Sequence, residues 1–274
     1  MSRFCGFIKS VVAYSMTITT LMFSFIPEKW YSYGVVEVNF DSDTIILCNR
    51  LLNLLLVFTL VCVGKLLYNY FKTSITIKHD CYKIVVEYAD IFDKREDKKV
   101  ISFDECFTTK LGEAPSEIKS TSICGQFLIQ NHGINVDELI VETGLKIQRK
   151  RSEFQNKECY ESGRLLPYKD FLLLSFAKLD NYGRGCLTRK EYIRCLEVLW
   201  EEIDKYYACR SVAIPILGSG ITRFGDELLT KQQLLDIIIS SYKMSAYKIK
   251  LPAELHIICR KTDDFSLNRV GEYI

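Results

Sequence analysis

Two long apolar runs stand out in the first quarter of the chain. Residues 7–26 contain one charged side chain, Lys9, and residues 51–71 contain only Lys65. Each run is about 20 residues long, the length that an α-helix needs to cross a hydrocarbon layer of about 30 Å. A signal peptide is the alternative for the first run, and a helical hairpin inside a soluble core is the alternative for both. The length of the runs and their shortage of charge favour two membrane spans.

Charged residues around these runs predict how the chain crosses the membrane. Arg3 precedes the first run and Lys72 follows the second, whereas the connecting residues 27–43 carry four acidic side chains and one lysine. The positive-inside rule then places both the N-terminus and the large C-terminal part in the cytoplasm. The sequence therefore divides into a multi-pass membrane hairpin, residues 1–74, and a cytoplasmic domain, residues 75–274.

A few polar side chains lie near the ends of the two predicted spans. They are Lys9, Arg50, Asn53 and Lys65. Long cationic side chains at such positions reach toward the lipid headgroups and act as interfacial anchors. Ionisable groups within spans also contact neighbouring helices when an assembly forms. Both interpretations are open at this stage, and anchoring is the simpler one.

From about residue 75 onward, short apolar and β-branched runs alternate with helical patterns. The expected strands are residues 83–92, 99–103, 170–179, 211–217 and 255–260. Two helices are marked by capping boxes, one formed by Thr188 with Glu191 and one by Thr230 with Gln233. Because strands and helices alternate, we expect an α/β fold with a central mixed sheet flanked by helices.

Residues 133–164 do not follow this alternation. The segment is polar and mixes positive with negative charge, which predicts a solvated helix or an excursion from the fold. It contains a basic cluster made of Lys146, Arg149, Lys150 and Arg151. Such a cluster can touch lipid headgroups or a nucleotide, but a solvated surface is its commoner use.

Composition narrows the classes of function. The 36 basic residues nearly balance the 34 acidic ones, giving a net charge of +2, which argues against a strongly electrostatic nucleic-acid binder. The 11 cysteines form no CxxC pair and the chain has only three histidines, so we expect no metal site. Free thiols in a reducing cytosol are the default for such a chain.

The segment "IPILGSGITRFG", residues 214–225, ends an apolar strand in two glycines. Glycine gives up packing and raises the entropy that folding must overcome, so the backbone at this point approaches another group closely. A tight turn and a bound phosphate explain the pattern equally well. Successive main-chain N–H groups form an anion-binding nest, and Thr222 adds a hydroxyl donor. The segment lacks the spacing of a P-loop or of GxGxxG.

Several motifs in order resemble a known family. "ADIF", "VISFDECFTTKLG", "SICGQFL", "LLLSFAKLD", "VLWEEID" and "IPILGSGITRFGDELL" are similar to macro domains, and more closely to the macro domain of membrane-anchored Thoeris effectors. The resemblance covers most of residues 82–267, and the two preceding spans match the same architecture. Thoeris is a bacterial anti-phage system in which a TIR-domain enzyme makes an ADP-ribose-type signal from NAD and an effector responds.

The resemblance implies a ligand-binding role for a set of residues. Asp90 and Ile91 match the positions that hold the adenine, and Phe265 matches an aromatic that stacks near the adenosine; ordinary packing explains Phe265 as well. The loop around the diphosphate matches Gly218, Ser219, Gly220, Ile221 and Thr222. The loop around the distal ribose matches Phe103, Asp104, Glu105 and Thr108. The implied ligand is an ADP-ribose derivative, with histidine-ADP-ribose as the known amino-acid conjugate, and no other cofactor.

The same resemblance leaves receptor and enzyme to be distinguished. Hydrolytic macro domains usually carry asparagines and a glycine pair in the distal-ribose loop, and "SFDECFTTKLG" has neither. A base at Asp104 or Glu105, or a nucleophile at Cys106 or Cys124, is the alternative, which gives a membrane-tethered ADP-ribosyl hydrolase. A third alternative is a membrane anchor or scaffold whose pocket is vestigial.

We therefore expect a non-enzymatic receptor in the bacterial inner membrane. Its partners are the lipid bilayer, the signal made by a TIR-domain protein and further copies of itself, with no nucleic acid. Ligand binding would drive homo-oligomerisation and membrane disruption, and the infected cell would die or stop growing. A ligand shifts such an equilibrium only through its difference in affinity for the two states.

Overall fold

A computed structural model describes residues 2–27, 30, 42–114, 116–149, 151–152, 154, 156–220, 222–225, 228–262 and 265–270, with the backbone alone for residues 2–5 and 42. The chain forms two compact units, Met1–Lys72 and Thr73–Ile274. Each unit is described by itself below.

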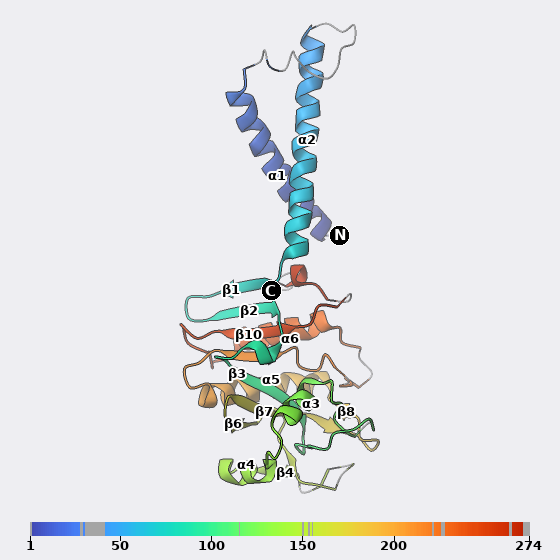
Figure 1. The fold of residues 1–274 in the computed structure, drawn as a ribbon, viewed down its shortest axis with the longest axis vertical. Coiled ribbons are helices and arrows are strands. Elements are labelled where there is room, and N and C mark those ends of the chain that lie inside the picture. Colours follow the sequence, from blue (N-terminus) through green and yellow to red (C-terminus); the bar gives the residue numbers. More distant parts are fainter. Residues whose placement is uncertain are drawn as a thin grey trace. The chain divides into compact units, whose positions relative to one another are not determined.

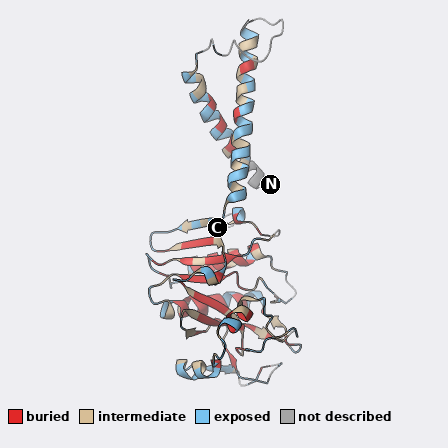
Figure 2. Ribbon diagram, viewed as in Figure 1, coloured by how far each residue is buried: buried red, intermediate tan, exposed pale blue. Residues whose placement is uncertain are grey.

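The first unit is a pair of packed helices, α1 (Ser2–Phe25) and α2 (Ser42–Phe71). Within them, Gly6–Phe25 and Asp43–Phe71 are long and apolar enough to cross a membrane. Only 17% of the first stretch and 11% of the second are buried, and most of both helices is exposed in Figure 2. A hairpin in the core of a soluble protein would be mostly buried, so that alternative does not describe these helices.

The second unit is built on a mixed sheet with strand order β1-β2-β10-β9-β3-β7-β6 (Figure 1). The strands are β1 (Ser74–Lys78), β2 (Lys83–Tyr88), β3 (Lys98–Asp104), β6 (Leu165–Tyr168), β7 (Phe171–Leu179), β9 (Val212–Pro215) and β10 (Leu255–Cys259). The five central strands run parallel, while β1 and β6 pair antiparallel at the two edges. The short β8 (Gly185–Cys186) pairs with the end of β7, and β4 (Ile147–Arg149) pairs with β5 (Cys159–Tyr160). Parallel central strands gather their carboxyl ends along one side of the sheet, where ligands of α/β folds bind.

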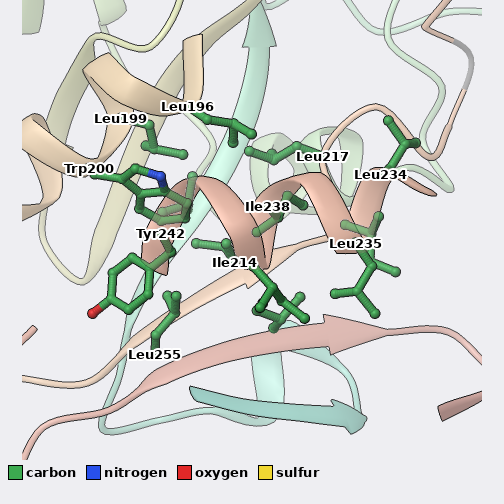
Figure 3. Close-up of a cluster of buried hydrophobic side chains, with 14 of the residues drawn as sticks. Leu196, Leu199, Trp200, Ile214, Leu217, Leu234, Leu235, Ile238, Tyr242 and Leu255 are labelled. Atoms are coloured by element: carbon green, nitrogen blue, oxygen red, sulfur yellow. The ribbon is translucent and has the colours of Figure 1, made fainter. Parts of the chain in front are cut away.

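Helices cover both faces of this sheet. One face packs against α5 (Arg189–Tyr206) and α6 (Lys231–Met244), and the other against α3 (Ile123–Gln130) and α4 (Val136–Thr143). Neighbouring strand residues alternate between the two faces: Val100 packs with the first cluster and Ile101 with the second. Figure 3 shows the first cluster, in which α6 lies between β9 with β10 and α5. The side chains labelled there are Leu196, Leu199, Trp200, Ile214, Leu217, Leu234, Leu235, Ile238, Tyr242 and Leu255.

The two predicted capping boxes are confirmed. The Thr188 hydroxyl accepts a hydrogen bond from the Glu191 N–H at 3.2 Å, and the Glu191 carboxylate accepts one from the Thr188 N–H at 2.8 Å. The pair Thr230 and Gln233 makes the same reciprocal contacts at the start of α6. The predicted strands are also found, and their ends agree with the prediction to within four residues. A mixed sheet flanked by helices is therefore the observed fold class.

Three parts of the prediction differ from the structure. The expected strand 83–92 ends at Tyr88, because the Asp90 carboxylate accepts from the Phe92 N–H at 2.9 Å and turns the chain into the short 3₁₀ helix η2 (Ile91–Asp93). The edge strands β1 and β6 were not expected. Residues 133–164 are no solvated excursion throughout, because they contain α4 and bury Cys159 and Tyr160 on the sheet.

A cluster of charged side chains links β2, β10 and the segment after η2. The Glu87 carboxylate lies 2.6 Å from both Lys94 Nζ and His256 Nδ1. Burial acts to raise the pKa of Glu87, but hydrogen bonds from His256 and Lys94 outweigh it and hold the pKa below the ordinary value. Because the folded pKa is the lower one, the unfolded chain takes up the proton first as the pH falls.

We expect Glu87→Gln to lower the free energy of unfolding by about 1–2 kcal/mol at pH 7. The stability that Glu87 contributes is present above its unfolded pKa of about 4.3 and is lost as the pH falls through the lower folded value. Thermal unfolding of both proteins between pH 7 and pH 3.5 should therefore show a gap that closes toward low pH. A gap that stays constant would show that the charge of Glu87 does not contribute.

Candidate functional site

A cavity of about 600 Å³ lies at the carboxyl ends of the parallel strands in the second unit. Its wall is formed by the ends of β3, β7, β9 and β10 and by the segments that follow them. Residues 116–119 and 121–124, which lead into α3, contribute a further part, as do Gly183 and Gly185 beside β8. A volume of this size is in the range of small-molecule and nucleotide sites.

The glycine segment after β9 forms one side of this cavity. Gly218 has a φ of +79°, and a Cβ placed there would lie 2.6 Å from Phe224 Cζ, so only glycine fits without strain. The Ser219 N–H and hydroxyl both donate to the Ile216 carbonyl, at 3.2 and 2.6 Å. Within the described residues, the N–H groups of Gly218 and Gly220 have no hydrogen-bond partner. The loop therefore holds a fixed turn while leaving main-chain donors at the cavity wall.

A buried tyrosine supports the root of this loop. Tyr192 on α5 is fully buried, and its hydroxyl donates to the carbonyl of Leu217 at 3.0 Å. Its ring also packs edge-on against Phe224, the residue that closes over Gly218. The α5 helix thus fixes the loop through one hydrogen bond and one aromatic contact.

We expect Tyr192→Phe to weaken ligand binding about three- to tenfold and to lower the free energy of unfolding by about 1–2 kcal/mol, because it removes a buried hydrogen bond at the loop. Tyr242→Phe is the matched control: its hydroxyl accepts from the Ile249 N–H at 2.9 Å, away from the residues that line the cavity. The control should lose similar stability and keep its affinity. Calorimetric titration and thermal unfolding of both variants measure the difference. Equal affinity in the two variants would exclude a role for Tyr192 in shaping the loop.

The end of β3, the strand beside β9, forms a further part of the wall. Phe103 and Asp104 both line the cavity. One Asp104 carboxylate oxygen accepts from the Cys106 N–H at 2.8 Å and from the Thr108 N–H at 3.0 Å. This carboxylate therefore holds residues 104–108 in a tight turn, in which Phe107 adopts a φ of +49°.

Glu105 is placed in the interior of the domain. Its side chain is 1% exposed, its carboxylate lies 2.5 Å from Arg149 Nη2, and its other oxygen accepts from the Leu179 N–H at 3.3 Å. It does not line the cavity. The Glu105 carboxylate thus forms an internal ion pair in this structure, and its contact with the ligand stays a prediction.

Some of the residues implied by the resemblance line the cavity and others do not. The cavity brings together Phe103, Asp104, Gly218, Ser219, Gly220 and Thr222. Four more lie outside its lining: Asp90, Ile91, Thr108 and Phe265. Asp90 caps η2 at the same side of the sheet, and Ile91 is buried against Ala213 and Ile258. Phe265 is buried and packs edge-on against Tyr88, and Ile221 lies outside the described residues.

Sequence reasoning missed several residues that line the cavity. Cationic side chains lie at Lys119, Lys231 and Arg260, against acidic ones at Asp104 and Glu117. Lys231, in the first turn of α6, donates from Nζ to the Thr262 hydroxyl at 3.1 Å. Glu117 is paired with Lys110 at 2.6 Å. The cationic groups and the start of α6 favour an anionic ligand. The capping box at Thr230 was the available signal for this helix start.

Among the cysteines near the site, Cys124 and Cys159 are buried and Cys106 is half-buried. Burial raises the pKa of Cys106 to about 12 and raises that of Cys124 well above its ordinary value. Cys159 also has a raised pKa, chiefly through burial, and its Sγ lies 3.9 Å from that of Cys106. Glu105, Cys106 and Cys159 form a compact group of possible metal ligands. Burial raises the pKa of both thiols, which disfavours a thiolate nucleophile, and Arg149 already pairs with the Glu105 carboxylate.

A mixed sheet with helices on both faces and a glycine loop at its carboxyl edge defines an α/β domain of the macro type. The sequence model of the family described as "Thoeris protein ThsA, Macro domain" matches residues 84–260. The chain is also 31% identical over 207 residues to the Thoeris protein ThsA of Bacillus amyloliquefaciens (strain Y2), covering 72% of this chain and 69% of that protein. The chain therefore belongs to the ThsA macro-domain family of Thoeris anti-phage defence.

Solved macrodomains are similar at a lower level. The Oceanobacillus iheyensis macrodomain with ADP has 10% identity and a TM-score of 0.45, covering 70% of this chain and 90% of its own. The same macrodomain with MES bound has 10% identity and a TM-score of 0.40, covering 74% of this chain and 94% of its own.

Proposed function

We propose that the second unit is a receptor for an ADP-ribose derivative. The observation that carries the proposal is the cavity at the sheet edge, where the N–H groups of Gly218 and Gly220 have no partner among the described residues. Main-chain donors of this kind hold the oxygens of a diphosphate without a strongly basic pocket, which agrees with a net charge of +2. Family membership supports the same ligand class.

The distal end of the ligand lies, in this proposal, near residues 116–119 and Gly183. This part of the wall offers the side chains of Ser116, Glu117 and Lys119, which can hydrogen-bond a polar substituent. An amino-acid conjugate, histidine-ADP-ribose, is the first ligand to be tested. A TIR-domain enzyme that consumes NAD is its source.

The membrane part of the proposal rests on the first unit. Its two exposed apolar helices span the bacterial inner membrane, with the macro domain on the cytoplasmic side, as the basic flanks indicate. Ligand binding orders the loops of the cavity and favours a homo-oligomer through a difference in affinity between two states, about 1.4 kcal/mol for each tenfold. The assembled spans then permeabilise the membrane, and the infected cell stops supporting phage.

The test uses the full chain purified in detergent. Calorimetric titration with histidine-ADP-ribose, ADP-ribose and AMP should give saturable, stoichiometric binding of at least one ADP-ribose compound and little binding of AMP, which lacks the diphosphate. Chromatography of the ligand after long incubation separates a receptor from an ADP-ribosyl hydrolase, because only the enzyme consumes it. No affinity for any ADP-ribose compound would leave a scaffold with a vestigial pocket.

A second arm identifies the natural ligand. The chain is co-expressed with a TIR-domain protein in infected cells, and the small molecules retained on the purified protein are identified by mass spectrometry. An ADP-ribose conjugate that is absent without the TIR protein is the expected result. Retention of the same molecule without that partner would contradict the proposed source.

A further inference from the structure

The contact face between α1 and α2 is unusually polar for a pair of membrane helices. On α1, Val11, Ser15 and Thr19 are buried at intervals of four residues. On α2, Asn49 and Val57 are buried eight positions apart, which also places them on one face of the helix. The remaining faces expose leucine, isoleucine and phenylalanine, as lipid contact requires. We call the set Ser10, Ser15, Thr19, Asn49, Asn53 and Lys65 the polar seam.

A cation lies near each end of this seam. Lys65 Nζ contacts the hydroxyl of Ser10 and lies 5.4 Å from the ring centre of Phe7 and 5.9 Å from that of Tyr14. Arg50 Cζ lies 5.6 Å from the ring centre of Phe23. In the packed hairpin, aromatic faces and a hydroxyl therefore shield both charges. Because Ser10 belongs to α1, Lys65 contacts the neighbouring helix within this hairpin, and its contact in an assembly stays a prediction.

One hydroxyl of the seam has no partner among the described residues. Thr19 is 5% exposed, and its Oγ1 is buried without a hydrogen bond. Thr17, Ser24 and Thr59 instead donate to the carbonyl four residues before them, the usual solution for a hydroxyl in a membrane helix. An unpaired hydroxyl in a nonpolar layer is unfavourable, and contact with water would remove that penalty.

The charges within the two spans are nearly all positive, because Asp43, at the first position of the second span, is their one acidic residue. Residues 2–27 and 44–71 contain no aspartate or glutamate. Arg50 and Lys65 are 15 positions apart, which is about 22 Å along an α-helix, so the two cations lie toward opposite ends of a layer of about 30 Å. In a ring of copies, each position would form a ring of positive charge, the arrangement that admits anions and repels cations.

We propose that in the assembled state the polar seam faces water and lines an anion-permeable pathway across the membrane. This inference rests on the proposed function, because it requires the spans to assemble. Polar residues also act as glue between membrane helices. Association between helices does not by itself explain why Arg50 and Lys65 are both cations, or why the Thr19 hydroxyl has no partner among the described residues. The pathway accounts for both, because anions and water replace the aromatic shields when the hairpins rearrange.

The test reconstitutes the full chain in planar bilayers under a tenfold KCl gradient, with histidine-ADP-ribose and, separately, ADP-ribose as the added probe. The expected result is a probe-dependent conductance whose reversal potential has the sign of the chloride gradient, with chloride about fivefold or more as permeable as potassium. Arg50→Gln with Lys65→Gln should lower that ratio at least about threefold, and Lys65→Glu should shift it toward potassium.

Lys9→Gln is the matched control. Lys9 has the same charge and lies on α1, but its side chain is exposed and lies outside the seam, so selectivity should not change. Each variant is checked for folding by gel filtration in detergent and by calorimetric binding of the same probe. Unchanged selectivity in the double variant, or an equal change in Lys9→Gln, overturns the pathway.

The two proposals fail in different ways. Probe-dependent leakage that does not distinguish chloride from potassium, or that releases large dyes from vesicles, overturns the anion pathway and leaves the receptor and membrane roles standing. Probe binding without any flux overturns the pathway together with the membrane role, while the receptor role stands. Absence of both binding and flux overturns all three.

Discussion

Replacing Gly220 with tryptophan is expected to weaken binding of the ADP-ribose ligand by at least about 100-fold, or about 2.7 kcal/mol, while the fold stays intact. Gly220 lines the cavity, and a Cβ built on it meets no atom within 4 Å. Its φ is also one that other residues adopt, so the backbone does not resist the change. The indole therefore fills ligand space without straining the domain.

Calorimetric titration and thermal unfolding of Gly220→Trp, with Gly220→Ala beside it, measure this result. The alanine variant should bind within about threefold of the wild type, because a methyl group occupies little of the space that a diphosphate needs. Gly218→Ala provides the contrast. Its Cβ would clash with Phe224 at 2.6 Å in a left-handed conformation, so it should lower stability as well as affinity. Unimpaired binding by Gly220→Trp would place the ligand elsewhere.

Replacing Arg149 with methionine is expected to lower the unfolding midpoint by about 5–10 °C, the equivalent of about 2–3 kcal/mol. Methionine keeps the length of the aliphatic stem but leaves the buried Glu105 carboxylate without its cation. The Glu105 side chain is 1% exposed and the Arg149 side chain 37%, so most of the penalty falls on the carboxylate. Thermal unfolding of the full chain in detergent measures it.

Two further variants separate charge from packing. Arg149→Met combined with Glu105→Gln should recover part of the loss, because the amide can stay buried without a counter-charge. Arg151→Met, on an exposed arginine two positions along, should leave the midpoint within about 1 °C of the wild type. A double variant less stable than Arg149→Met alone would show that the ion pair is not what holds Glu105 in place.

Local signals in the sequence were sufficient for the central sheet and for the long helices. The strand 170–179 is a near-continuous apolar run because β7 is buried on both faces, and Leu172 and Leu173 pack into opposite clusters. The capping box at Thr188 located the start of α5, because a capping box depends only on two residues three positions apart. Edge strands carry a weaker signal. β1 alternates between exposed and half-buried positions, and β6 contains Pro167, so neither shows a strong apolar run.

The candidate site was harder to predict because it depends on contacts between distant segments. The register of β3 against β7 shifts between Phe103 and Asp104, so that both residues reach the cavity and Glu105 turns into the interior. A motif of consecutive residues cannot show such a shift. The partner of Glu105, Arg149, lies 44 positions away in a segment whose basic residues suggested a solvated surface. The glycine loop was found from sequence because its constraint is local.

The cavity wall combines main-chain groups with variable side chains. Residues 218–220 offer main-chain groups and tolerate few replacements, whereas Ser116, Glu117 and Lys119 offer side chains that substitution can change. In the proposed receptor, contacts with the diphosphate can therefore persist while recognition of the variable part of the ligand changes. Exchanging a few side chains at residues 116–119 should therefore produce receptors that respond to different signals without cross-reaction in one bacterium. A phage that destroys one of these signals would then leave the other signal effective.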